Sequence, residues 1–143
     1  MNNFSETSRA RLKTCHRDLQ LLFNHVAQDY DCTVVCGYRT EKEQQEAFAA
    51  GNSKLEWPHS KHNKTPSLAV DVVPYEITHI DWSKLQSAHF AGYVKGVADR
   101  LFHIGVISHH IRFGVDWDLD NDIDDTTFWD GCHFEIILND KDK

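Results

Sequence analysis

Two short segments combine histidine and carboxylate side chains at spacings that suit a metal site. The first contains His62 and Asp71, and the second contains Asp130 and His133. Two imidazoles and one carboxylate suit catalytic zinc, which takes three protein ligands and leaves a fourth position for water. The sequence therefore indicates a hydrolytic zinc centre with His62, Asp71 and His133 as the metal ligands.

The remaining carboxylate, Asp130, fits the role of proton carrier. Zinc lowers the pKa of a bound water from about 15.7 to about 7. A carboxylate must then accept the proton and pass it to the leaving amine. Asp130 precedes His133 closely enough to reach this water without binding the metal. Its alternative role is to cap a turn before a strand.

Strand geometry explains how residues far apart in the chain can meet. Side chains alternate between the two faces of a sheet, so in LAVDVV we expect Asp71 on the face opposite the flanking valines. In CHFEII, His133 and Glu135 share the face opposite Phe134. An aspartate inside an apolar strand needs a polar partner, which His133 on a neighbouring strand would provide. We expect Glu135 to support His133, and Cys132 to point away as a packing thiol.

The pattern of apolar residues predicts the elements that position these side chains. Helical spacing and capping residues indicate helices over 8–29, 41–50 and 84–104. Runs of β-branched and aromatic residues indicate strands over 33–38, 68–73, 109–114 and 132–138. We therefore predict one α+β domain over 1–143, with a small, mainly antiparallel sheet and helices packed on one face.

Composition excludes several classes of function. The net charge of −7 argues against nucleic acid as the main partner, because phosphate binding needs a basic surface. The chain has no apolar run long enough to enter a membrane, and its first residues lack the apolar stretch of a secretory signal. We expect a cytoplasmic, monomeric protein whose four cysteines are free thiols.

The motifs resemble a known family. Ser60-Lys61-His62, Ala69-Val70-Asp71 and Asp130-Gly131-Cys132-His133 match the pattern S-x-H, A-x-D and carboxylate-x-x-H, and Gly37–Thr40 with Gln45 matches its arginine segment. The chain thus resembles the zinc D-alanyl-D-alanine peptidases, specifically the phage branch of L-alanyl-D-glutamate endopeptidases. It departs from the pattern in a longer spacer with Ser67 in place of glycine, and in having Asp where many relatives have Glu as the base.

The resemblance implies a fold of the hedgehog/DD-peptidase type and an endolysin that hydrolyses the L-alanyl-D-glutamate bond of peptidoglycan stems. Such an enzyme would wait in the host cytoplasm until a pore releases it to the cell wall. A D,D- or L,D-carboxypeptidase would use the same ligands. A zinc-stabilised binding module without turnover is the alternative from another class.

The resemblance also assigns a role to each candidate side chain. The two histidines and Asp71 would bind zinc, and Asp130 would be the general base and acid. Arg39 would steady the oxyanion or a substrate carboxylate, although it could instead pair with an acidic residue. Ser60 and Gln45 would contact the peptide. His59 is an alternative to His62 as the ligand.

The acidic segment DWDLDNDIDD suggests a second ion. Alternating carboxylates are typical of the first positions of a calcium loop, and some relatives in the endolysin branch are calcium-regulated at a similar place. Asn121 and Thr127 stand where an EF-hand has glycine and glutamate, so a solvated acidic turn is the alternative. The possible calcium ligands are Asp116, Asp118, Asp120 and Asp122.

Overall fold

A four-stranded antiparallel sheet lies at the centre of the computed structural model, which describes residues 4–75 and 80–142. The strands stand in the order β1-β2-β4-β3. Their bounds are Cys32–Cys36 for β1, Ala69–Pro74 for β2, Ile111–Phe113 for β3 and His133–Ile136 for β4. The α+β class, the antiparallel sheet and the four strand positions are confirmed.

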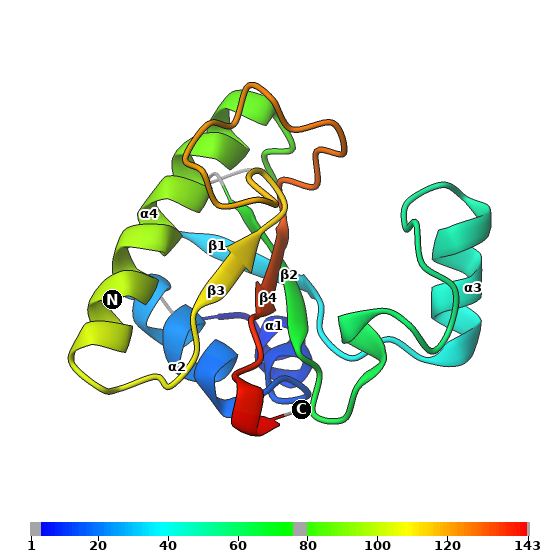
Figure 1. The fold of residues 1–143 in the computed structure, drawn as a ribbon, viewed down its shortest axis with the longest axis horizontal. Coiled ribbons are helices and arrows are strands. Elements are labelled where there is room, and N and C mark those ends of the chain that lie inside the picture. Colours follow the sequence, from blue (N-terminus) through cyan, green and yellow to red (C-terminus); the bar gives the residue numbers. More distant parts are fainter. Residues whose placement is uncertain (1–3, 76–79, 143) are drawn as a thin grey trace.

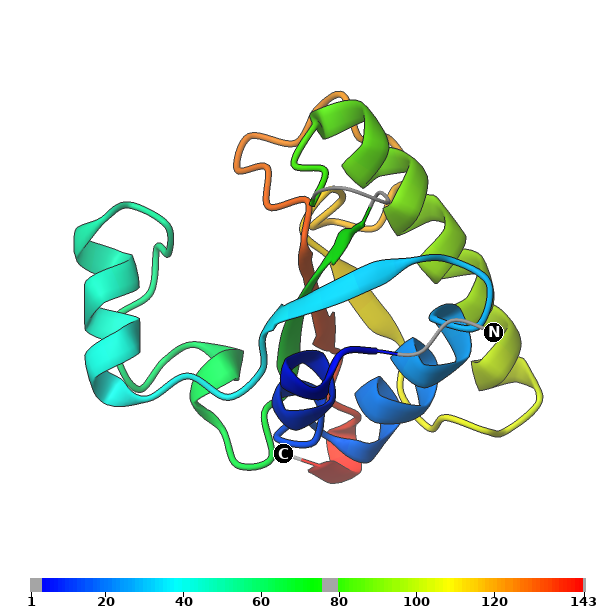
Figure 2. The same cartoon turned by 180° about the vertical axis from the view of Figure 1, so that it is seen from behind.

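Helices α2 (Arg17–Val26) and α4 (Lys84–His103) cover one face of this sheet, and α1 (Glu6–Leu12) packs against β1. The remaining α-helix, α3 (Glu41–Ala49), stands apart from the others beyond the opposite side of the sheet (Figures 1 and 2). Two short 3-10 helices, η1 (Lys61–Asn63) and η2 (Asp140–Asp142), complete the described elements. None of the described helices is long and apolar enough to cross a membrane.

The single helix expected over 8–29 was wrong, because the chain forms α1 and α2 with a break between them. Cys15 forms an isolated β-bridge with Ser67, and the Ser67 carbonyl accepts a hydrogen bond from the backbone N–H of His16. The His16 side chain then caps the start of α2. Apolar spacing continues through the break, so this pairing with a distant residue was not visible in the periodicity.

The alternation expected for the two central strands is confirmed. Val70, Val72, Phe134 and Ile136 are fully buried on the helix-covered side. The Phe134 ring packs edge-on against three other phenylalanine rings, those of Phe23, Phe90 and Phe113. The polar members of β2 and β4 therefore emerge together on the opposite face.

Candidate active site

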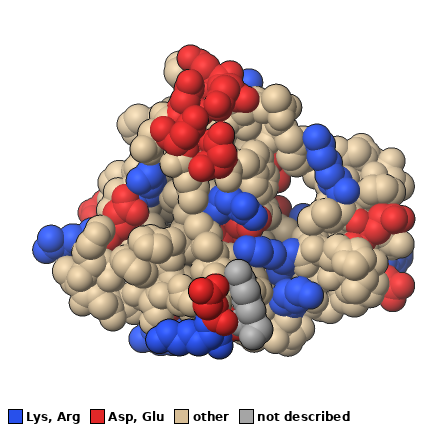
Figure 3. Space-filling model, in the orientation of Figure 1, with Lys and Arg blue, Asp and Glu red and all other residues tan. Residues whose placement is uncertain are grey.

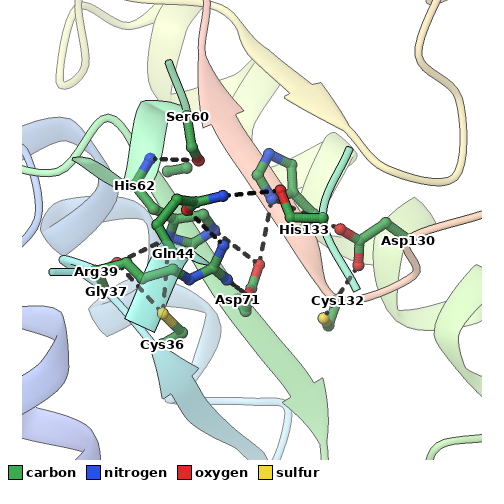
Figure 4. A network of polar contacts seen from close by, with 12 residues as sticks. Cys36, Gly37, Arg39, Gln44, Ser60, His62, Asp71, Asp130, Cys132 and His133 are labelled. Atoms are coloured by element: carbon green, nitrogen blue, oxygen red, sulfur yellow. Dashed lines mark hydrogen bonds and ion pairs between the residues drawn. The ribbon is translucent and has the colours of Figure 1, made fainter. Parts of the chain in front are cut away.

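The three expected ligands meet on the face of the sheet away from α2 and α4. Asp71 of β2 and His133 of β4 are directly opposite each other in the strand register, and His62 comes from η1. Asp71 Oδ1 lies 3.2 Å from Nε2 of His62 and 3.2 Å from Nδ1 of His133. Figure 4 shows the Asp71 carboxylate between the two imidazoles, whose centroids are 5.2 Å apart.

The second nitrogen of each imidazole already has a fixed partner. Nδ1 of His62 lies 2.7 Å from the Gly37 carbonyl oxygen, to which it can only donate. Nε2 of His133 lies 2.9 Å from the Glu135 carboxylate, as expected for a supporting acid. These contacts turn Nε2 of His62 and Nδ1 of His133 toward Asp71, so these two nitrogens can bind a metal once they lose their protons.

Two of the three separations between these ligand atoms match the spacing of a tetrahedral zinc site. Zinc–nitrogen bonds of 2.0–2.1 Å place neighbouring ligand atoms roughly 3.3 Å apart in a tetrahedron. Both separations from Asp71 Oδ1, at 3.2 Å, match this spacing. The groups whose ligand atoms all lie within 4.8 Å of one another divide this trio, as Cys36, His62 and Asp71 and as Asp71, Asp130 and His133. A zinc ion bound by all three expected ligands would therefore draw the two imidazoles closer together around Asp71.

The buried aspartate controls the protonation of this cluster. Burial disfavours the imidazolium of His62, but the negative charge of Asp71 outweighs it and raises the pKa of His62 to about 10. Burial likewise opposes charge on His133, while hydrogen bonds to Asp71 and Glu135 raise its pKa to about 9. The two imidazoles hold the pKa of Asp71 well below its usual range despite its burial. Asp71 is thus the negative charge at the centre of the cluster, and it stabilises either protons on the two imidazoles or a bound cation.

Asp130 lies beside the cluster, with Oδ2 3.9 Å from Nδ1 of His133. Burial and then the charge of Asp71 raise the pKa of the Asp130 carboxyl, which favours proton transfer near neutral pH. The backbone of Asp130 donates to the Gly114 carbonyl at 2.9 Å. A Cβ at position 114 would collide with the Asp130 carbonyl, so Gly114 permits this placement.

Cys132 was expected to point away from the site, and this was wrong. Its thiol donates to Oδ1 of Asp130 at 3.4 Å, and the residue lines an open cleft beside the cluster. The residue precedes β4, so the alternation of that strand does not extend to it. Burial and the nearby charge of Asp71 raise the pKa of this thiol, which stays protonated. The four cysteines are free thiols, as expected.

Arg39 is already paired in this structure. Its Nη2 donates to Asp71 Oδ2 at 3.4 Å and its Nη1 donates to Gln44 at 3.1 Å. Gln44 is fully buried, whereas the expected substrate contact Gln45 is exposed and accepts a hydrogen bond from Trp57. The contact of Gln45 with substrate stays a prediction. Both glutamines belong to α3, and the orientation of this helix directs Gln44 toward Arg39, which the sequence did not indicate.

Ser60 is buried and holds the backbone of the site. Its side chain accepts from the backbone N–H of His62 at 3.2 Å and caps η1. It also lines the cavity, so a substrate contact stays a prediction. His59 lines the cavity as well but is exposed and belongs to none of the ligand groups found among the described residues.

A second set of potential ligands overlaps the first. Cys36, His62 and Asp71 also lie close enough together to hold a metal ion. The Cys36 sulfur lies 3.8 Å from Nδ1 of His62, on the side of the ring that bonds Gly37. Because that nitrogen already bonds Gly37, His62 would have to use Nε2, which faces Asp71, to bind a metal.

An open cleft of about 1070 Å³ gives access to the cluster. Residues from the end of α3 and the following loop line one side, and residues 127–130 line the other. Four aromatic side chains contribute to the walls, namely Trp82, Trp117, Phe128 and Trp129. The cleft is large enough for a peptide, and the metal-binding candidates lie along it.

The acidic loop brings together three of the four expected calcium ligands. Carboxylate oxygens of Asp116, Asp118 and Asp120 lie within 4.8 Å of one another, whereas Asp122 is outside this group. Asp116 is buried, and its Oδ1 has no hydrogen-bond partner among the described residues. Figure 3 shows the acidic side chains gathered at one end of the molecule.

Comparisons with known proteins identify the family and the fold of the chain. A family model described as phage L-alanyl-D-glutamate peptidase matches residues 1–137. The crystal structure of Serratia marcescens L-Ala D-Glu endopeptidase ChiX is similar, with a TM-score of 0.74 and 23% sequence identity over 99% of this chain and 96% of that chain. At this identity the likeness shows a shared fold. No curated protein sequence matches the chain.

Replacement of Glu135 tests the support of His133. In Glu135→Gln the amide can donate to Nε2 of His133 and so place the proton on Nδ1, the nitrogen needed by the metal. We expect zinc affinity to fall by about 10–100-fold, measured by competition with a chromophoric chelator. The control is Glu46→Gln on exposed α3, and equal affinities for both folded variants would exclude the supporting role.

Proposed function

Because the chain belongs to the phage L-alanyl-D-glutamate peptidase family, we propose that it cleaves this bond in peptidoglycan stems at a zinc centre made by His62, Asp71 and His133. The observation that carries the proposal is the placement of Asp71 Oδ1 3.2 Å from one nitrogen of each imidazole. The outward nitrogens of both rings are held by other groups, so the inward pair is prepared for a metal.

Asp130 is the general base and acid of the proposed reaction. Zinc at the site would supply Lewis acidity for the attacked carbonyl and the attacking water. The Asp130 carboxylate accepts a proton from that water and returns it to the leaving amine. The Cys132 thiol holds Oδ1 of Asp130, so Oδ2, the oxygen nearer His133, carries the proton.

Arg39 has a positioning role in this proposal. Its ion pair with Asp71 Oδ2 orients that carboxylate so that Oδ1 faces the imidazoles. Its side chain is only 15% exposed, and Gln44 holds the other arm of the guanidinium. Direct contact with the oxyanion or a substrate carboxylate therefore requires Arg39 to release one of these partners.

The proposed biological role is that of an endolysin. Phage peptidases of this specificity act on the cell wall of the host at the end of infection, so the enzyme would accumulate in the cytoplasm and reach the wall after a separate pore forms. In this account the protein works as a monomer on the peptidoglycan stem peptide.

We also propose calcium at Asp116, Asp118 and Asp120. The support is the buried Oδ1 of Asp116, which lacks a partner among the described residues, together with the close approach of the three carboxylates. The Asp116 segment continues from Gly114, whose carbonyl bonds the backbone of Asp130. Calcium would thereby order the loop next to the general base.

Removal of the general base tests the reaction. Asp130→Asn keeps the shape of the side chain but cannot accept the proton, and we expect kcat on defined muropeptides to fall by about 10²–10⁴-fold with zinc affinity nearly unchanged. The matched control is Asp29→Asn, at an exposed turn residue that follows α2. Chelation by EDTA should abolish cleavage and added zinc should restore it.

Several results would contradict this proposal. Full activity of Asp130→Asn, or activity that survives complete removal of metal, would exclude the mechanism. Release of free D-alanine without cleavage next to L-alanine would instead identify a carboxypeptidase. Stem peptides that stay intact with every added metal would indicate a binding module.

The pKa values predict how pH affects metal binding. With pKa values of about 10 for His62 and about 9 for His133, both side chains are cationic imidazoliums below pH 9 in the metal-free protein. Zinc must displace both protons, so its affinity rises with pH by up to about 100-fold per unit and levels off above both pKa values. Calorimetry at pH 7 in buffers of different ionisation enthalpy should show about two protons released, and release of none would contradict the protonated cluster.

Calcium should stabilise the wild-type protein through the acidic loop. We expect millimolar calcium to raise its Tm, and Asp116→Asn to lose this response because a charged ligand is missing. Asp124→Asn is the control, since this exposed residue lies outside the group. If neither calcium nor magnesium changes the Tm of the wild-type protein, the calcium site is excluded and the segment is a solvated acidic turn.

A further inference from the structure

Two basic side chains share one buried carboxylate next to the proposed zinc ligands. Glu135 uses Oε1 for His133, and its Oε2 lies 2.9 Å from Lys61 Nζ and 2.8 Å from Arg112 Nη2. Arg112 Nε also donates to Oε2 at 3.3 Å. Two positive charges thus face one negative charge, and the group keeps a net positive charge one side chain away from His133.

Both basic side chains remain accessible from the cleft. The side chain of Lys61 is 27% exposed and that of Arg112 is 39% exposed, compared with 15% for Arg39. Arg112 lies over the Trp117 ring, 5.7 Å from its centroid, and its Nη1 has no hydrogen-bond partner among the residues that the structure describes. Figure 3 shows basic side chains gathered in the middle of this face, below the acidic end.

The position of Lys61 and Arg112 favours a ligand that extends from the large cleft into the neighbouring cavity. Lys61, Arg112 and Trp117 line both the large cleft and a second cavity of about 510 Å³. Asp118 lines the second cavity but not the large cleft, and its charge would repel an anion there. A negatively charged group is therefore favoured at the junction of the two cavities, between His133 and Asp118.

The proposed substrate carries such a group. Glutamate has two carboxyl groups, and only one of them can continue the peptide chain, so the other stays a free carboxylate unless it is amidated. Building on the proposed function, we propose that Lys61 and Arg112 form a subsite for this free carboxylate of the D-glutamyl residue. These two residues would thus recognise the D-glutamyl residue, which carries the leaving amine. Arg39 has a different role, because it holds Asp71.

Two synthetic stem peptides test the subsite on the zinc-loaded enzyme. They differ only in whether the D-glutamyl residue carries a free carboxylate or a carboxamide. We expect wild-type kcat/KM to be about tenfold higher for the carboxylate, equivalent to about 1.4 kcal/mol, mainly through KM. Arg112→Gln and Lys61→Met should each lower kcat/KM more for the carboxylate peptide than for the carboxamide peptide, so the preference shrinks toward one.

The control is Lys54→Met, which removes a cation that lines the same cleft over Phe128 and should keep the preference. Equal cleavage of both peptides by the wild-type enzyme would overturn the subsite alone. Equal loss on both peptides in Arg112→Gln and Lys61→Met would also overturn it, since these residues would then only hold Glu135. Cleavage of neither peptide by the zinc-loaded wild type would overturn the proposed function, and the subsite with it.

Discussion

The site depends on one carboxylate that the strand pattern forces out of the core. Asp71 stands between Val70 and Val72, which are fully buried on the opposite face. A charged group at 8% exposure is costly unless it is paired. His62, His133 and Arg39 all contact this carboxylate, and their arrangement follows from the need to stabilise it.

The strands and the loops contribute differently to this arrangement. Register fixes Asp71 opposite His133, so these two residues cannot separate without loss of the β2–β4 pairing. His62 lies in η1 and Asp130 in a loop, both outside the sheet, and both are held by close backbone approaches that need glycine. A Cβ at Gly37 would collide with Thr14 and the Arg11 carbonyl, and one at Gly114 would collide with the Asp130 carbonyl. The glycines thus let the loops reach a centre that the sheet has already positioned.

Much of this could be predicted from the sequence, and the failures share a physical cause. Alternation along β2 and β4 placed Asp71, His133 and Glu135 on one face, because side-chain direction in a strand is a local property. The break between α1 and α2 depends on Ser67, which lies far away in the chain. The sharing of Glu135 by Lys61 and Arg112 also depends on tertiary packing, and neither residue drew notice as part of the site. The contact between Gln44 and Arg39, which the sequence did not indicate, depends on the orientation of α3.

The coordination of zinc tests the central role of Asp71 most directly. X-ray absorption at the zinc edge of the loaded protein should show two imidazole nitrogens at about 2.0–2.1 Å with carboxylate oxygen, and no sulfur, since thiolate ligands lie at about 2.3 Å. Asp71→Asn should lose this signature together with tight binding. A sulfur ligand from Cys36, or a single imidazole, would contradict the convergence of His62 and His133 on one ion.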